Sequence, residues 1–205
     1  ALQMDATFGA DGAKKMLDAA GAPPTFSIEG AKASLAKSKT PDGFTVDLPI
    51  DPSQPWMSPL AQHLAENAKQ IGITINVKQV SAADWGTGLT DPNSSPLQLV
   101  ALGAGTPWAG ELPPVIYGST AGFGVARYGN ADVDALAGKV AVADTVDELR
   151  QPLQDLLAAS AKDLPYLPLF DEQVATAISN KFTWEGGYTY YALGQAWALQ
   201  VGGAG

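Results

Sequence analysis

The chain has 205 residues, of which 46% are apolar, and its 12 basic and 21 acidic residues give a net charge of −9. This apolar content supports a hydrophobic core and excludes a largely disordered chain, and no run of 18 apolar residues predicts a membrane span. The absence of cysteine excludes disulfides, thiolate metal sites and cysteine nucleophiles. The basic residues are scattered among acidic ones, which argues against nucleic acid as a partner.

The first forty residues are rich in alanine, glycine and lysine and predict two short helices, over residues 11–20 and 28–36. In the second helix, Ile28, Ala31 and Leu35 share one face. No secretory signal pattern opens the chain. We therefore expect either that a signal has been removed or that the chain begins within a longer protein.

A strand–helix–strand pattern follows the predicted turn at Thr40-Pro41-Asp42-Gly43, where glycine accepts a positive φ. Residues 44–50 alternate apolar and polar side chains, as in a strand with one buried face, and residues 73–77 do so again. Between them, Ser58 and Pro59 are typical of a helix start and Gly72 of a helix end. We therefore predict a βαβ unit with parallel strands and a right-handed crossover. The apolar stripe of its helix comprises Leu60, Leu64, Ala68 and Ile71.

One more strand is predicted beyond this unit. Residues 97–102 are mostly apolar, as in a third, buried strand, and lead into a glycine- and proline-rich loop over residues 103–114. Residues 163–170 contain two prolines and are expected to be extended. Residues 182–201 are expected to form loops and short strands.

Two more helices are predicted from their caps. Asn130 precedes an apolar stripe formed by Val133, Leu136 and Val140. Thr145 and Glu148 form a capping box that opens the second helix, and Pro152 predicts a kink within it. The inward side of that helix comprises Leu149, Leu153, Leu156 and Leu157.

No catalytic residue, cofactor or metal site is predicted. His63 is the only histidine, and the chain supplies no partners for a triad or a zinc site. The glycine pairs at 103/105 and 122/124 lack the third glycine and the helix start of a dinucleotide site. A carbohydrate hydrolase with two loop carboxylates is an alternative. The carboxylates available to it are Asp47, Asp51, Asp84, Glu111 and Glu185.

Tryptophans in loops are the strongest candidates for ligand contacts. Trp56, Trp108 and Trp184 lie beside proline or glycine, as either wedges over the core or platforms for a ligand. Flat amphipathic rings suit sugar faces and peptide side chains. Trp85 and Trp197 are expected to lie in the core.

Five short motifs follow one another along residues 40–170. They are Gly43-Phe-Thr-Val-Asp-Leu-Pro, Gln70-Ile-Gly-Ile-Thr-Ile-Asn-Val, Leu99-Val-Ala-Leu-Gly-Ala-Gly, Arg127-Tyr-Gly-Asn-Ala-Asp-Val-Asp-Ala-Leu and Asp163-Leu-Pro-Tyr-Leu-Pro-Leu-Phe. Their order and spacing resemble the large C-terminal lobe of extracellular solute-binding proteins of family 5. That family comprises the peptide- and oligosaccharide-binding components of ABC importers.

The resemblance implies an α/β fold, namely one lobe of a two-lobed, periplasmic-binding-protein-like fold (type II, cluster C) with a mixed sheet flanked by helices. It implies a ligand-binding lobe over residues 40–170. Residues 171–205 are expected to return toward an N-terminal lobe that is absent from this chain. The resemblance leaves residues 1–39 poorly placed. The implied partners are a small-molecule ligand, the membrane subunits of an ABC permease and the missing lobe. It also implies a binding protein rather than an enzyme, located outside the cytoplasm and anchored as a lipoprotein in its full-length form.

The resemblance favours an oligosaccharide over a peptide as ligand. Peptide-binding members carry an aspartate for the peptide α-amine where this chain has Pro107, and a tryptophan where it has Ala104. Oligosaccharide-binding members share pairs similar to Trp56-Met57, a loop similar to Gly105-Thr106-Pro107-Trp108, and a tryptophan followed by tyrosine. The ligand-binding residues expected on this basis are Trp56, Thr106, Trp108, Trp184 and Tyr188. Trp56 and Trp108 are expected to face one cleft from neighbouring strand ends, with the Thr106 hydroxyl offered to a sugar.

Overall fold

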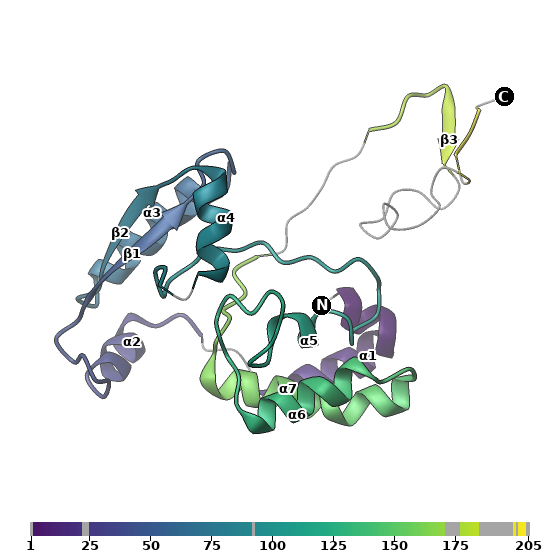
Figure 1. The fold of residues 1–205 in the computed structure, drawn as a ribbon, viewed down its shortest axis with the longest axis horizontal. Helices are drawn as coiled ribbons and strands as arrows, with labels where there is room; N and C mark the ends of the chain where they lie inside the picture. Colours follow the sequence, from purple (N-terminus) through teal and green to yellow (C-terminus); the bar gives the residue numbers. More distant parts are fainter. Residues whose placement is uncertain are drawn as a thin grey trace. The chain divides into compact units, whose positions relative to one another are not determined.

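Helices dominate the structure in Figure 1, a computed structural model that describes residues 2–21, 25–91, 93–170, 177–184, 199 and 201–203. The described chain falls into two compact units. The sheet unit comprises the described residues of Pro23–Leu102 and Gly122–Tyr128. The helical unit comprises those of Ala1–Ala22, Gly103–Ala121 and Gly129–Gly205.

The sheet unit is built on β1 (Thr45–Ile50), α3 (Met57–Lys69) and β2 (Thr74–Gln79). The two strands pair in parallel with Leu48 opposite Val77, which confirms the predicted βαβ unit. A buried cluster, onto which Trp85 packs as predicted, fills the space between the strands and α3. Its members are Leu48, Ile50, Met57, Ala61 and Leu99. Each fully buried leucine or isoleucine contributes about 1.5–3 kcal/mol to folding.

The turn before β1 requires glycine, as predicted. Gly43 has φ +94°, and a Cβ there would lie 2.0 Å from the carbonyl oxygen of Gly72. Gly72 itself has φ +87° and ends the segment after α3. The two glycines therefore let the starts of both strands approach closely.

Helix α3 differs in two details from the prediction. It begins at Met57, and its N-cap is Trp56, whose side chain makes no capping hydrogen bond, so Ser58 lies inside the first turn. The buried stripe is centred on Met57, Ala61 and Ala65, with the predicted leucines half-buried along its side. Small residues at the centre of the stripe allow the helix to lie close to the sheet.

The predicted third strand is wrong, because residues 97–102 form no strand. Backbone bonds from Thr74 to Phe44 and from Val80 to Ile50 place even-numbered carbonyls of β1 toward β2. Odd-numbered residues therefore face the free edge, where Pro49 has no N–H to donate to a further strand. At this edge the Ser95 hydroxyl, rather than a backbone amide, bonds the carbonyl of Asp47.

Two further helices complete the sheet unit. Helix α2 (Ile28–Leu35) is capped by Ser27, and it buries no residue fully, although its expected apolar face is the least exposed. Helix α4 (Ala82–Thr90) is capped by the Ser81 hydroxyl. Arg127 donates hydrogen bonds to the Asp91 carbonyl and to Ser94 Oγ, and so ties residues 122–128 to the end of α4.

The helical unit contains α1 (Leu2–Ala20), α5 (Pro113–Ile116), α6 (Ala131–Ala141) and α7 (Val146–Asp163). The Asn130 cap and the Thr145–Glu148 capping box are both present, as predicted. Helix α7 runs through Pro152 without interruption and ends at Asp163, and its C-cap, Leu164, adopts a left-handed conformation. The inward faces of α6 and α7 bury Val133, Val140, Leu149, Leu153 and Leu156.

Helix α1 is longer than predicted, since it extends back to Leu2 across a kink at Gly9 with φ 70° and ψ 159°. It packs against α7 and buries Met4, Ala13 and Met16. The Arg150 guanidinium lies 5.1 Å from the centre of the Phe8 ring, in a cation–π contact between the two helices.

The last described elements are two short strands. β3 (Phe182–Trp184) pairs antiparallel with β4 (Val201–Gly203), as the expectation of short strands requires. None of the helices in the described ranges has the length and apolarity needed to cross a membrane.

Candidate functional site

One carboxylate binds the loop that carries Thr106 and Trp108. Glu111 Oε1 accepts the Gly105 N–H at 2.9 Å, and Glu111 Oε2 accepts the Thr106 N–H at 2.8 Å and the Thr106 hydroxyl at 2.6 Å. Burial disfavours the charged carboxylate, but these three hydrogen bonds together outweigh it and lower the pKa of Glu111. Glu111 is therefore an ionised structural anchor at neutral pH rather than a free acid for hydrolysis.

Two side chains of helix α1 also bind this loop. Gln3 Nε2 donates to the carbonyls of Thr106 at 2.9 Å and Trp108 at 2.8 Å. Thr7 Oγ1 donates to the Pro107 carbonyl at 3.2 Å and accepts the Ala109 N–H at 2.8 Å. Residues 106–109 thus each have a backbone group bound to α1, which satisfies backbone groups that no strand or helix pairs.

The Trp108 ring is half-buried against its own loop. A Cβ on Gly110 would lie 2.6 Å from Trp108 Nε1 and 3.1 Å from a methyl carbon of Leu149. Glycine at this position therefore lets the indole edge rest on the backbone beside α7. The Thr106 hydroxyl donates its hydrogen bond to Glu111, so it can only accept a hydrogen bond from a ligand.

The other expected ligand residues lie in different parts of the chain. Trp56 belongs to the sheet unit, where it packs half-buried on the core cluster at the start of α3. Trp184 is half-buried in β3. Tyr188 and Trp197 lie outside the described residues. The third strand, on which the expected common sheet edge of Trp56 and Trp108 was based, is not formed by residues 97–102.

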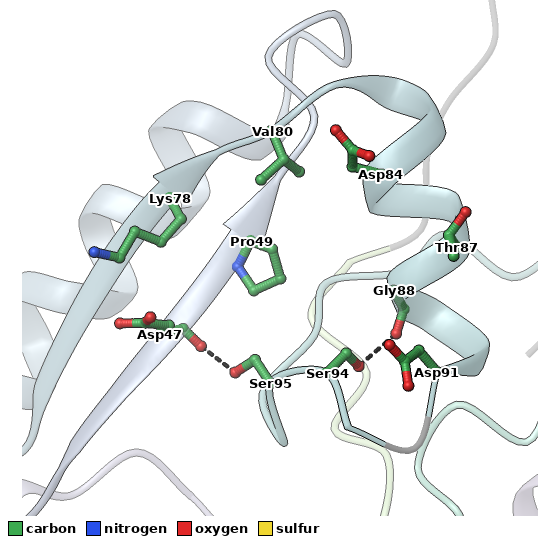
Figure 2. Close-up of a pocket in the computed structure, with 10 residues that line it drawn as sticks. All are labelled: Asp47, Pro49, Lys78, Val80, Asp84, Thr87, Gly88, Asp91, Ser94 and Ser95. Atoms are coloured by element: carbon green, nitrogen blue, oxygen red, sulfur yellow. Dashed lines mark hydrogen bonds between the residues drawn. The ribbon is translucent and has the colours of Figure 1, made fainter.

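The sheet unit has its own groove, over the face of β1 and β2 that carries Asp47, Pro49 and Lys78, and beside α4 (Figure 2). Its volume is about 440 Å³, and it is open to solvent. The other lining residues are Val80, Asp84, Thr87, Gly88, Asp91, Ser94 and Ser95. Three carboxylates against one lysine make the groove acidic.

Each of the groove's carboxylates already has a local partner. Asp47 Oδ1 accepts from Asn76 at 3.0 Å, and Asp84 Oδ2 accepts from the Ser81 hydroxyl at 2.7 Å. Asp91 Oδ1 accepts the N–H of Asn93 at 2.8 Å. The bonds of Asp84 and Asp91 belong to the start of α4 and to a turn, and the bond of Asp47 links β1 to β2, so the structure of the sheet unit accounts for the acidic lining.

The carboxylates considered for the hydrolase alternative have different settings in the part of the chain that the structure describes. Asp47 and Asp84 share the groove, whereas Asp51 is buried and accepts from the N–H and hydroxyl of Ser53. Glu111 lies in the helical unit, and Glu185 lies outside the described residues. His63 is exposed on α3, and no group of three metal-ligating side chains occurs in the part of the chain that is described.

Sequence reasoning missed Gln3 and Thr7, which lie in the segment that no motif placed. Their contacts with the loop join residues 100 to 105 positions apart. Their separation of four residues puts them on one helix face, but nothing in the sequence indicates what that face contacts.

No family model and no curated protein matches the chain, whereas solved structures do. NikA from Staphylococcus aureus, in complex with Ni(L-His)2, matches with a TM-score of 0.61 and 25% identity over 69% of this chain and 31% of its own. A dipeptide-binding protein from Pseudoalteromonas sp. SM9913, in complex with Met-Leu, matches with a TM-score of 0.61 and 18% identity, over 70% and 29%. A mannohexaose-bound periplasmic oligopeptide-binding protein from Thermotoga maritima matches with a TM-score of 0.55 and 21% identity, over 76% and 32%.

These neighbours are solute-binding proteins, and they define the fold class. The chain has the mixed α/β fold of part of a lobe of periplasmic-binding-protein-like structures, as expected. It spans about three tenths of the length of the first structures that it matches.

Proposed function

We propose that this chain is part of the substrate-binding protein of an ABC importer, which captures a small ligand and delivers it to the membrane permease. The observation that carries the proposal is the shared fold with NikA at a TM-score of 0.61, joined to the order of the five motifs. The similar structures are binding proteins rather than enzymes, which supports a role without turnover. The hydrolase alternative has no comparable support.

A peptide is the ligand class that we now favour, which reverses the preference from the motifs. The similar structures include a dipeptide-binding protein with Met-Leu and a peptide-binding protein of a peptide ABC transporter. The Thr106 hydroxyl, as an acceptor, can bond either a peptide N–H or a sugar O–H, so the preference comes from the similar structures. An oligosaccharide is the second candidate, favoured by the mannohexaose-bound structure.

The proposed ligand contacts are Thr106 and Trp108 in the helical unit, with Trp56, Trp184 and Tyr188 as further candidates from the resemblance. The proposed partners are the ligand, the permease subunits and an N-terminal lobe that completes the cleft. Residues 171–205 are proposed to return to that lobe. We place the full-length protein in the periplasm or outside the cell, anchored as a lipoprotein.

Calorimetry of the full-length protein with Met-Leu, mannohexaose and Ni(L-His)2 tests this proposal. We expect saturable binding of Met-Leu, weaker or no binding of mannohexaose, and intact ligand after prolonged incubation. Tighter binding of mannohexaose would replace the peptide assignment by the oligosaccharide one. Cleavage of either organic ligand would contradict the binding-protein role.

A further inference from the structure

We propose that Gln3, Thr7 and Glu111 are positioning residues for Trp108, so that the first helix sets ligand affinity without touching the ligand. This inference rests on the proposed function in one respect, namely that the Trp108 ring contacts the ligand. The clasp is defined here as the hydrogen bonds that join Gln3, Thr7 and Glu111 to residues 105–109.

The side of the clasp formed by α1 fixes four successive residues of the loop. Gln3 Nε2 bridges the carbonyls of Thr106 and Trp108, at 2.9 and 2.8 Å. Thr7 Oγ1 bonds the residues between and after them, Pro107 at 3.2 Å and Ala109 at 2.8 Å. A loop with its backbone held at every residue has little freedom to reorient the ring that it carries.

The side of the clasp formed by Glu111 fixes the residues just before the ring. Its carboxylate takes the N–H groups of Gly105 and Thr106 and the Thr106 hydroxyl. Gln3 Nε2 also approaches Glu111 Oε2 at 3.4 Å, which joins the two sides. Hydrogen bonds to an ionised carboxylate are stronger than neutral ones, so Glu111 is the firmer side.

The helix that supplies Gln3 and Thr7 is itself held firmly. Ala13 and Met16 are 1% and 3% exposed where α1 packs against α7. Phe8 lies under the Arg150 guanidinium of α7. The kink at Gly9 separates the part of α1 that carries Ala13 and Met16 from the part that meets the loop, and the latter also contacts α7 through Phe8. Ligand-contacting groups held by such a supporting shell bind with less ordering cost.

The side chain of Thr7 offers the sharpest test, because valine keeps its shape and removes the hydroxyl, while serine keeps the hydroxyl. We would compare Thr7→Val, Thr7→Ser and Gln3→Ala in the full-length protein, with Lys15→Ala on the exposed side of α1 as control. The structural readout is the ¹H–¹⁵N signal of the Trp108 indole, assigned with Trp108→Phe. The functional readout is the dissociation constant for Met-Leu and for mannohexaose.

We expect Thr7→Val and Gln3→Ala to shift the Trp108 indole signal and to weaken binding of the preferred probe at least fivefold. Thr7→Ser should restore both properties, and Lys15→Ala should change neither. An unchanged indole signal in Thr7→Val, or equal affinity of Thr7→Val and Thr7→Ser, overturns the inference. If the wild-type protein binds neither of these probes nor Ni(L-His)2, the proposed function fails, and the indole signal still decides whether the clasp positions Trp108.

Discussion

Glu111 shows how one side chain can be both charged and structural in this protein. Its carboxylate accepts three hydrogen bonds from Gly105 and Thr106 and is partly shielded from water. Burial alone would raise the pKa of this group, but the hydrogen bonds lower it further than burial raises it. In the sequence, Glu111 was one candidate for the catalytic carboxylates of a hydrolase. In the structure, its two oxygens accept hydrogen bonds from the loop.

The lowered pKa of Glu111 predicts a stability contribution that depends on pH. A carboxyl group with a depressed pKa in the folded state stabilises that state above its unfolded pKa, and the contribution is lost as pH falls through the folded pKa. We expect the amide signals of Gly105 and Thr106 to move in a single acid titration with a midpoint below the ordinary glutamate value. Glu111→Gln should abolish this titration, and its persistence in Glu111→Gln would contradict the assignment.

At the scale of elements, the kink of α1 depends on a single glycine. Gly9 combines φ 70° with ψ 159°, a region that only glycine adopts without strain, and a Cβ there would meet nothing within 4 Å. Gly9→Ala should therefore destabilise the protein by about 1–3 kcal/mol through backbone strain alone.

Gly138 in α6 is the matched control, since a Cβ there also meets nothing within 4 Å and its φ is not positive. Gly138→Ala should stabilise the protein by up to about 1 kcal/mol, because alanine is the better helix former. Urea unfolding of both variants measures the difference in the free energy of unfolding. Equal effects of the two substitutions would show that the Gly9 conformation is not required.

Elements with local signals were predictable from the sequence, and elements with distant partners were not. The Asn130 cap and the Thr145–Glu148 capping box follow from residues within one turn of each other, and the βαβ unit follows from three consecutive segments that each carry their own periodicity. Residues 97–102 have the composition of a buried strand, and Leu99 is indeed buried. They form no strand because burial and strand pairing are separate requirements, and Pro49 weakens the free edge of β1.

The candidate site shows the same limit more strongly. Thr106 and Trp108 were found from their loop and from the resemblance, because aromatic residues beside proline and glycine are visible in a sequence. The side chains that hold them were not found, since Gln3 and Trp108 are 105 residues apart and no alternation or cap links them. Trp108 was expected at the carboxyl edge of the sheet because a third strand was predicted before it, and residues 97–102 do not form that strand.

For the whole molecule, the central claim is that this chain contributes to the cleft of a solute-binding protein through the loop that carries Trp108. The fold shared with NikA supports the solute-binding part of this claim, and the clasp describes how the loop holds the half-buried Trp108 ring. Removal of the Trp108 ring therefore tests its role in ligand binding.

The most direct measurement is the dissociation constant of the full-length protein for Met-Leu before and after Trp108→Ala. The control is Trp85→Phe, because Trp85 packs on the core of the sheet unit and its buried Nε1 has no hydrogen-bond partner to lose. We expect Trp108→Ala to weaken binding at least about tenfold, which corresponds to about 1.4 kcal/mol, and Trp85→Phe to leave the affinity unchanged. An affinity that survives Trp108→Ala in the folded protein would show that Trp108 only covers the core and would contradict the account.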